Sequence, residues 1–274
     1  MCENSLRKAQ LLQLDIAKEI KRVCEKNAIP YFFIAGTLLG AVRHQGFIPW
    51  DDDLDIGMLR SDYETFIKVC KDDLDDRFFL QNWETDKYFG LPFSKVRLNN
   101  THYVERNSAK VRAHDGIYVD IFPFDNVPDD KRLQKKHDRE TYLLKRLLLV
   151  KNGYECWEDD ETIKKMIYKS IKLFTLPVSL KFLQKKLLKV MMRYNDLETD
   201  WIVTFGGSYG YTKESIEKKW VSECTELSFE KICFSVPGSY KEYLSYFYGD
   251  YMQLPPEDKR GNRHNIQKID FGEY

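Results

Sequence analysis

The sequence predicts an α+β fold in which a small mixed sheet is flanked by helices and is followed by a helical second half. Three observations predict it. An amphipathic helical repeat covers residues 5–27, short apolar or alternating runs recur between residues 31 and 122, and long basic helical stretches follow from residue 129. The 274 residues suffice for one large domain or two small ones, and the change of pattern predicts a boundary between 1–128 and 129–274.

The first half alternates helices with short strands. Apolar residues at helical spacing predict a helix over 5–27, and the run Tyr31–Ala35 predicts a buried strand. A tight turn at Gly36 and Thr37 then leads into a short helix over 38–43. The alternation of residues 53–57 predicts a second strand, and Ser61 is the expected N-cap of a helix that ends near residue 71.

Alternation over residues 93–98 predicts a further strand, which Asn99 and Asn100 would connect to a returning strand over 101–106 as a hairpin. Residues 117–122 predict another strand, ended by Pro123 and Pro128. Helices are expected over 129–151, 161–174 and 179–198, and a strand over 229–236. Pro237 would open the first turn of a helix over 240–248, and the charged tail from residue 249 is expected to be loop-like.

Charge and cysteine content exclude several classes of protein. The 43 basic and 43 acidic residues balance, which argues against a dedicated nucleic-acid binder. The six cysteines contain no C-x-x-C pair, so neither a zinc ribbon nor a dense disulfide framework is indicated. No apolar stretch resembles a signal peptide or approaches about 20 residues. We therefore expect a cytoplasmic protein, with peripheral contact at the inner membrane face left open.

Four carboxylates within residues 51–55 are the strongest chemical signal in the chain. If Leu54 and Ile56 point into the core, Asp53 and Asp55 project together from the other face of the strand. Two adjacent carboxylates on a rigid strand suit a hard divalent cation such as Mg²⁺, with one or two ions expected. The competing interpretation is an acidic, solvated loop.

Asp120 lies in the apolar strand Tyr118–Phe122 and is the best candidate for a third metal-binding carboxylate, since an unpaired buried carboxylate is costly. It could instead pair with an arginine or cap a turn. The candidates for holding phosphate are the turn residues and four nearby cationic or imidazole side chains: Gly36, Thr37, Arg43, His44, Lys95 and Arg97. Each of the last four could equally be a solvated or helix-capping residue.

Two further questions stay open at this level. Trp50, Trp83 or Tyr118 could enclose a quaternary ammonium group, although the same residues suit a core. The tail could fold over the site and offer Arg260, Arg263 or His264, or it could be disordered.

Three familiar motifs are absent. An EF-hand would need Gly and Glu where residues 56 and 62 are Ile and Asp. Residues 36–40 match neither a P-loop nor a dinucleotide-binding fingerprint. No Gly-x-Ser-x-Gly nucleophile elbow occurs.

The chain resembles the LicD family in four blocks: GTLLGAVRHQGFIPWDDDLDIGM, FSKVRL, YVDIFPFD and YFYGDYMQLPPEDKR. The resemblance spans most of the chain, with little signal between about residues 130 and 200. It implies a nucleotidyltransferase-like catalytic core over 1–128 and a mostly helical region, 129–274, that completes the substrate site. Asp53, Asp55 and Asp120 match the family's catalytic acids, and Thr37 keeps the hydroxyl of its Gly-Ser turn.

The resemblance implies Mg²⁺-dependent transfer of a phospho-alcohol from a CDP-activated donor to a sugar hydroxyl of a cell-surface glycan. Phosphocholine from CDP-choline is the expected case, with a teichoic acid or lipopolysaccharide precursor, as a free or lipid-linked glycan, as acceptor. Two alternatives remain: a D-x-D glycosyltransferase that uses a nucleotide sugar, and a catalytically silent member that only binds glycan.

Overall fold

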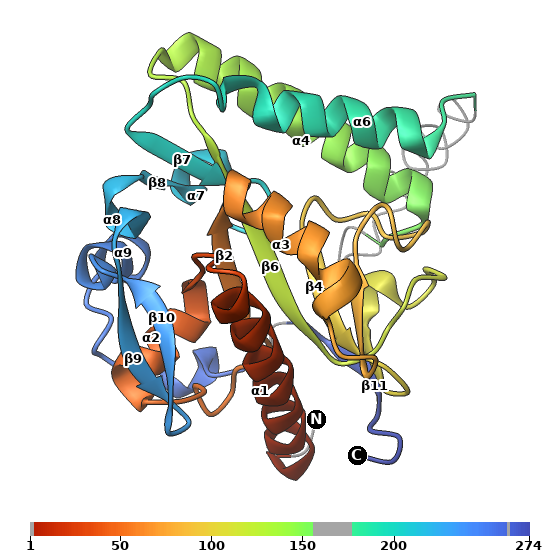
Figure 1. Ribbon diagram of the computed structural model, residues 1–274, viewed down its shortest axis with the longest axis vertical. Helices are drawn as coiled ribbons and strands as arrows, with labels where there is room; N and C mark the ends of the chain where they lie inside the picture. The colour runs from red at the N-terminus through yellow and green to blue at the C-terminus, as the bar shows by residue number, and fades with distance from the viewer. Residues whose placement is uncertain (1–2, 156–176, 262–263) are drawn as a thin grey trace.

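The computed structural model describes residues 3–155, 177–261 and 264–274 (Figure 1). In this part of the chain the fold is a mixed α/β structure around a seven-stranded sheet. Strands β1, β2, β6, β4 and β3 are neighbours in that order, while β7 pairs with β6 and β8 with β7. The strands are β1 (Phe32–Phe33), β2 (Asp55–Leu59), β3 (Phe78–Gln81), β4 (Ser94–Leu98), β6 (Tyr118–Asn126), β7 (Trp201–Thr204) and β8 (Ser215–Glu217).

Strand β6 is the central strand, and eight of its nine residues are buried. It pairs in parallel with β2 on one edge, while β4 and then β7 pair with it antiparallel on the other edge. The register makes Asp55 and Lys95 the two cross-strand partners of Asp120. Because residues at the same register position point to the same face of a sheet, three charged side chains form one row across β2, β6 and β4.

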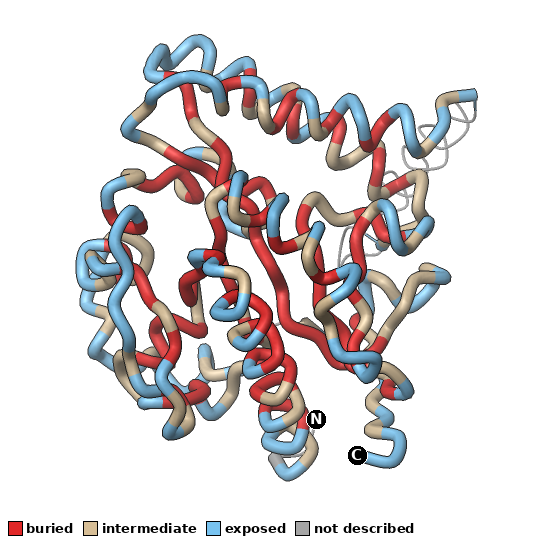
Figure 2. The backbone as a smooth tube through the Cα atoms, in the orientation of Figure 1, coloured by how far each residue is buried: buried red, intermediate tan, exposed pale blue. Residues whose placement is uncertain are grey.

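Helices α1 (Glu3–Lys26) and α3 (Arg60–Asp73) lie across one face of this sheet (Figure 1). The predicted amphipathic stripe of α1 is confirmed, because Ile16, Ile20 and Val23 are fully buried in the main core. Figure 2 shows the buried backbone concentrated in the sheet and on the inner side of α1. These helices exclude water from one face of the sheet. The charged row lies on the other face, which other segments cover.

A second group of elements packs together beside the sheet. It consists of helix α2 (Ala35–His44), the hairpin of β9 (Cys224–Phe229) and β10 (Ile232–Pro237), and helix α9 (Tyr240–Tyr248). The hairpin turns at Glu230 and Lys231, which both have positive φ, as two-residue hairpin turns require. Pro237 ends β10, so its predicted place in the first turn of α9 is wrong. Short helices α7 (Tyr211–Glu214) and α8 (Lys219–Ser222) flank β8.

Helices α4 (Lys131–Asn152) and α6 (Leu180–Met191) lie side by side at one end of the molecule (Figure 1). Asp130 caps α4 by accepting hydrogen bonds from Arg132 N and Leu133 N, and Gly153 ends it in the left-handed conformation. The helices share a smaller core with Val203 and Phe205. None of the described helices combines the length and apolar character that a bilayer crossing requires.

Two expectations about pairing and content are corrected. Strand β5 (His102–Glu105) pairs with β11 (Ile266–Asp270) instead of forming a hairpin with β4, because β3 and β6 already occupy both edges of β4. The described part of the second half also contains five strands, β7 to β11, and is less helical than predicted. Since β7 extends the sheet begun in the first half, the boundary at residue 128 stays a prediction; the predicted helix over 161–174 lies outside the described residues.

Several predicted boundaries also move. Strand β2 begins at Asp55 and not at residue 53. Helix α3 begins at Arg60 after the extended residue Leu59, so Ser61 is no N-cap; Arg60 turns inward to form a buried ion pair with Asp125 at 2.6 Å. Strand β6 continues through Pro123 to Asn126. The remaining short elements are the 3₁₀ turns η1 (Arg106–Ser108), η2 (Met192–Tyr194) and η3 (Glu257–Lys259).

Candidate active site

A cavity of about 680 Å³ lies against the acidic segment. Its walls come from the start of α2, residues 48–55, Ser208 and Tyr209, the end of α9 and the tail from residue 250 to 264. Segments from both ends of the chain therefore build one cavity. Of the two possibilities that the sequence leaves open for the tail, the structure shows the folded one, since residues between Asp250 and His264 line the same cavity as Asp53 and Asp55.

Three carboxylates of the acidic segment line this cavity: Asp51, Asp53 and Asp55. Burial, followed by the charges of neighbouring acids, holds the pKa of Asp51 and of Asp55 well above the usual range. Burial also raises the pKa of Asp53, although His264 opposes that rise. Ionising these carboxylates together is therefore costly unless a cation joins them.

Asp120 lies beside Asp55 in the sheet, but it is only 5% exposed and is not among the described residues that line the cavity. Its Oδ1 and Oδ2 lie 2.8 and 3.2 Å from Lys95 Nζ. Burial raises the pKa of Asp120 to about 6, while Lys95 opposes that rise. The structure thus gives Asp120 both of its expected environments, a neighbouring acid on β2 and a cation on β4.

Lys95 and Arg97 do lie on one face of β4, as predicted, but both are buried and neither is among the described residues that line the cavity. Lys95 Nζ also lies 3.7 Å from Glu105 and 3.3 Å from the centre of the Tyr118 ring. Arg97 donates hydrogen bonds to the side chain of Gln81 and to Gly116 O. Their described partners are therefore groups of the protein itself.

The predicted turn at Gly36 and Thr37 is the first turn of α2, which begins one residue earlier at Ala35, where φ is +48°. No side chain caps this helix start, and Ala35 and Gly36 line the cavity. A Cβ on Gly36 would lie 2.6 Å from Asp51 Oδ2, so glycine allows the carboxylate to approach the helix. Thr37 Oγ1 accepts a hydrogen bond of 2.8 Å from Asp55 N.

Arg43 lines the cavity, and its Nη1 donates hydrogen bonds to Tyr251 O at 2.8 Å and Gln253 O at 3.1 Å. It thereby ties α2 to the tail. His44 lies edge-on to Trp50, with 6.2 Å between ring centres, and is not among the described cavity residues. Burial lowers the pKa of both side chains.

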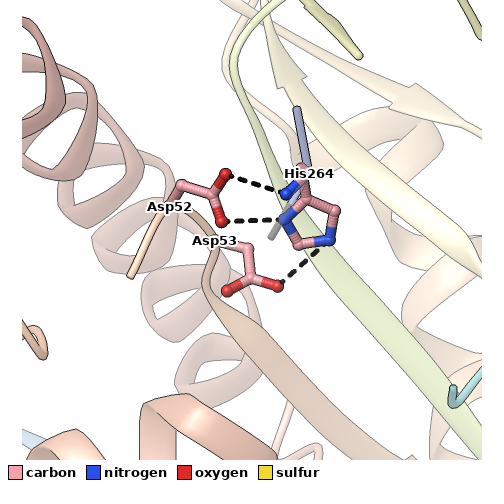
Figure 3. A group of neighbouring side chains, drawn as sticks. All are labelled: Asp52, Asp53 and His264. Carbon is pink, nitrogen blue, oxygen red and sulfur yellow. Dashed lines mark hydrogen bonds and ion pairs between the residues drawn. The ribbon is translucent and has the colours of Figure 1, made fainter. Parts of the chain in front are cut away.

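His264 connects the tail to the acidic segment (Figure 3). Its Nδ1 lies 2.8 Å from Asp52 Oδ1, and its Nε2 lies 3.6 Å from Asp53 Oδ2. Burial alone would lower the pKa of His264, but the hydrogen bond to Asp52 and the charge of Asp53 raise it to about 10. Asp52, Asp53 and His264 also form a group whose ligand atoms lie within 4.8 Å of one another.

Aromatic residues line the cavity as well as acidic ones. Trp50, Tyr209, Tyr248 and Tyr251 line it. Of the three aromatic residues singled out from the sequence, Trp50 alone is among these described residues. Trp83 packs against the smaller core and Tyr118 is fully buried beneath Lys95.

Sequence reasoning missed the tyrosines and assigned no role to Asp51 or Asp52. Asp51 and Asp52 could have been found from the acidic run itself, and His264 was already named as a tail candidate. Tyr209 carries no local signal, and Tyr248 could have been found only as part of the block YFYGDYMQLPPEDKR, because the fold alone brings these residues to the acidic segment.

The donor set of the cavity fits a hard divalent cation. Asp51, Asp53 and Asp55 offer carboxylate oxygens, which Mg²⁺ prefers, and burial is the main cause that raises the pKa of each. The uncapped start of α2 faces the same cavity and suits a phosphate group. This arrangement is suited to binding a metal-complexed diphosphate.

Comparisons with known proteins identify the family of the chain. Residues 28–148 match the family model described as LicD/FKTN/FKRP, nucleotidyltransferase domain. The chain is 31% identical to the lipopolysaccharide cholinephosphotransferase LicD of Haemophilus influenzae, over 96% of this chain and 97% of that protein. Uncharacterised proteins of Rickettsia typhi and Rickettsia prowazekii are each 51% identical over 23% and 20% of this chain, respectively, which is 20% and 21% of their own lengths. The chain belongs to the LicD family.

Proposed function

We propose that this protein transfers phosphocholine from CDP-choline to a sugar hydroxyl of a lipopolysaccharide or teichoic acid precursor, before the glycan is exported from the cytoplasm. The name of the Haemophilus relative supports the transferred group and a lipopolysaccharide acceptor. The observation that carries the proposal is that carboxylates, a helix start and four aromatic rings line a single cavity. A diphosphate and a quaternary ammonium group need these two kinds of lining.

Asp53 and Asp55 would hold magnesium, and Asp120, their neighbour on β6, would complete the acidic set. Magnesium, when bound, would supply positive charge to the diphosphate of the donor. The start of α2 at Gly36 would bind phosphate oxygens. Trp50 and the cavity tyrosines would enclose the trimethylammonium group.

In the reaction the acceptor oxygen attacks the phosphorus that carries choline, and the bond from that phosphorus to the oxygen of CMP breaks. CMP leaves with the bonding electron pair. The hydroxyl proton must pass to a base. Asp120 is the proposed base, because it lies beside the cavity residue Asp55 in the sheet and a carboxylate can take up the hydroxyl proton.

The test is CMP release from CDP-choline by purified protein with Mg²⁺ and a soluble acceptor oligosaccharide. We expect Asp53→Asn and Asp55→Asn each to lower turnover by at least about a hundredfold, since each removes charge from the metal site, while the melting temperature is kept. Asp129→Asn, an exposed acid outside the cavity, is the matched control.

Full Mg²⁺-dependent turnover in either cavity variant would contradict the proposal. Release of nucleotide from a UDP-sugar instead of CDP-choline would favour a glycosyltransferase. Binding of glycan without Mg²⁺ binding or turnover would indicate the silent alternative.

A further inference from the structure

Helices α4 and α6, the basic hairpin, carry a large positive net charge in a chain that is neutral overall. The two helices contain twelve Lys or Arg and two acidic residues, hence a net charge of +10, whereas the whole chain is neutral. Residues 153–179, which connect the helices in sequence, contain five acidic and four basic residues, so they leave this excess almost unchanged. The positive charge of the molecule is therefore concentrated in one feature at one end (Figure 1).

Most of this charge faces solvent. Nine of the twelve basic residues are exposed, including Arg139 on α4 and Lys185, Lys186 and Lys189 on α6. Within the described part of the chain, Glu140 is the one acidic residue in ion-pair contact with any of the nine, through Lys136 at 4.0 Å. The charges are therefore available to an external anion.

Large apolar side chains are exposed among these charges. Tyr142 and Leu143 of α4 are 47% and 53% exposed, and Phe182 of α6 is 57% exposed. Arg139, Tyr142, Leu143 and Arg146 follow the spacing of one helical face. Basic and apolar side chains are thus mixed on the same outer surface.

The antiparallel packing of α4 and α6 places the exposed apolar residues Leu143 and Phe182 at similar positions along the helix axes. His137 Nε2 lies 2.7 Å from Val190 O, which fixes the register of the two helices. Leu143 follows this contact by six residues and Phe182 precedes it by eight. At about 1.5 Å per residue, their positions along the hairpin differ by only about 3 Å.

These outer residues are not required by the core. The inner side of the hairpin already packs Leu144, Leu148, Leu183 and Leu187 against Val203 and the neighbouring rings. The exposed apolar residues keep about half of their surface in water, so burial against an apolar phase would stabilise them further.

We propose that the outer face of the basic hairpin docks on an anionic lipid bilayer. Lysines and arginines would contact lipid phosphates, while Tyr142, Leu143 and Phe182 enter the boundary between head groups and acyl chains. Mixed basic and apolar surfaces bind bilayer interfaces through both contributions. A soluble polyanion such as an acidic glycan or a nucleic acid would use the charges and leave the apolar residues in water.

This contact is independent of the transfer reaction. None of the described residues that line the cavity belongs to α4 or α6. Substitutions on the outer face of the hairpin should therefore leave CMP release with a soluble acceptor unchanged.

The test is flotation of the full chain with vesicles of phosphatidylglycerol and phosphatidylcholine in equal parts, compared with vesicles of phosphatidylcholine alone. We expect at least about tenfold stronger partition to the anionic vesicles, reduced by salt. Lys185→Glu/Lys186→Glu and Leu143→Gln/Phe182→Gln should each reduce partition by about tenfold.

Matched controls change the same residue types elsewhere. Lys68→Glu/Lys241→Glu reverses two exposed lysines of α3 and α9, and Leu11→Gln/Tyr88→Gln changes two exposed apolar residues outside the hairpin. Both controls should bind as the unchanged protein does. Circular dichroism and CMP release with the soluble acceptor verify that each variant is folded.

Equal partition to both kinds of vesicle, or equal losses in the controls, would overturn the proposal. So would binding to heparin together with unaltered vesicle binding by Leu143→Gln/Phe182→Gln, because that result would assign the surface to a soluble polyanion. Loss of CMP release in the Asp53→Asn variant with normal flotation would separate the two proposals.

Discussion

Thr37 shows how one buried hydroxyl can position the acidic strand. Its side chain is 4% exposed, and Oγ1 accepts the hydrogen bond from Asp55 N at the point where β2 begins. The hydroxyl thus joins the first turn of α2 to the residue whose carboxylate lines the cavity. Sequence reasoning expected this hydroxyl to contact phosphate, whereas its described partner is the backbone of Asp55.

Replacement of Thr37 by Val should leave the buried Asp55 N–H without its acceptor, at a cost of about 1–3 kcal/mol in the free energy of unfolding. We also expect turnover to fall, because the start of β2 would shift relative to α2. Thr37→Ser keeps the hydroxyl and should retain most of both properties. Urea unfolding and CMP release are the measurements, and a Val variant with unchanged stability and turnover would refute this role.

At the scale of elements, the sequence predicts the extent of a helix better than it predicts which strands pair. The extent of α4 was predicted to within about two residues, because Asp130 and Gly153 provide its caps within the sequence itself. The hairpin of β4 with β5 was wrong, since pairing depends on which edges the rest of the chain leaves available. The alternating pattern likewise predicted that Asp55, Asp120 and Lys95 face one site. No local pattern predicts the strand β11 or the position of the cavity tyrosines.

His137 joins the two helices of the basic hairpin and should make their packing sensitive to acid. It is fully buried between Tyr211 Oη at 2.9 Å and Val190 O at 2.7 Å, and burial lowers its pKa below the ordinary 6.5. Because the unfolded chain then binds the proton more readily, the stability from neutral His137 is present above about pH 6.5. It is lost as the pH falls below that value.

We therefore expect the unfolding free energy to fall with acidification between about pH 7 and pH 5.5, by at most about 1.4 kcal/mol per pH unit from this one group. His137→Gln, which cannot titrate, should show a shallower dependence over the same range. Urea unfolding at several pH values provides the comparison. Identical slopes for the two proteins would show that His137 does not set this dependence.

For the whole molecule, the decisive feature is that residues from the C-terminal tail complete the wall of a cavity that is also lined by residues near the N-terminus. Strand β11 pairs with β5, His264 contacts Asp52 and Asp53, and Arg43 holds two carbonyls of the tail. The sequence left open whether the tail covers the site, because each of these contacts joins residues more than about 150 positions apart. Loop-closure entropy makes such contacts costly to form, so several anchors are needed to hold the tail.

Arg43 is the anchor that can be tested without touching a carboxylate. In Arg43→Met the apolar stem remains, while Tyr251 O and Gln253 O lose their donor. We expect faster proteolytic cleavage within residues 250–261 and a KM for CDP-choline raised by about fivefold or more, in line with about 1 kcal/mol for the lost hydrogen bonds. The melting temperature should change little, because α2 keeps its buried face.

Arg43→Lys separates this anchoring role from direct phosphate binding. A lysine can donate to one carbonyl, so partial protection of the tail from protease should return together with a lower KM. If Arg43 acts only on phosphate, Arg43→Met would raise KM while protease sensitivity stays at the level of the unchanged protein. The closed tail would then rest on β11 and His264, and the cavity wall between Asp250 and Pro256 would not depend on α2.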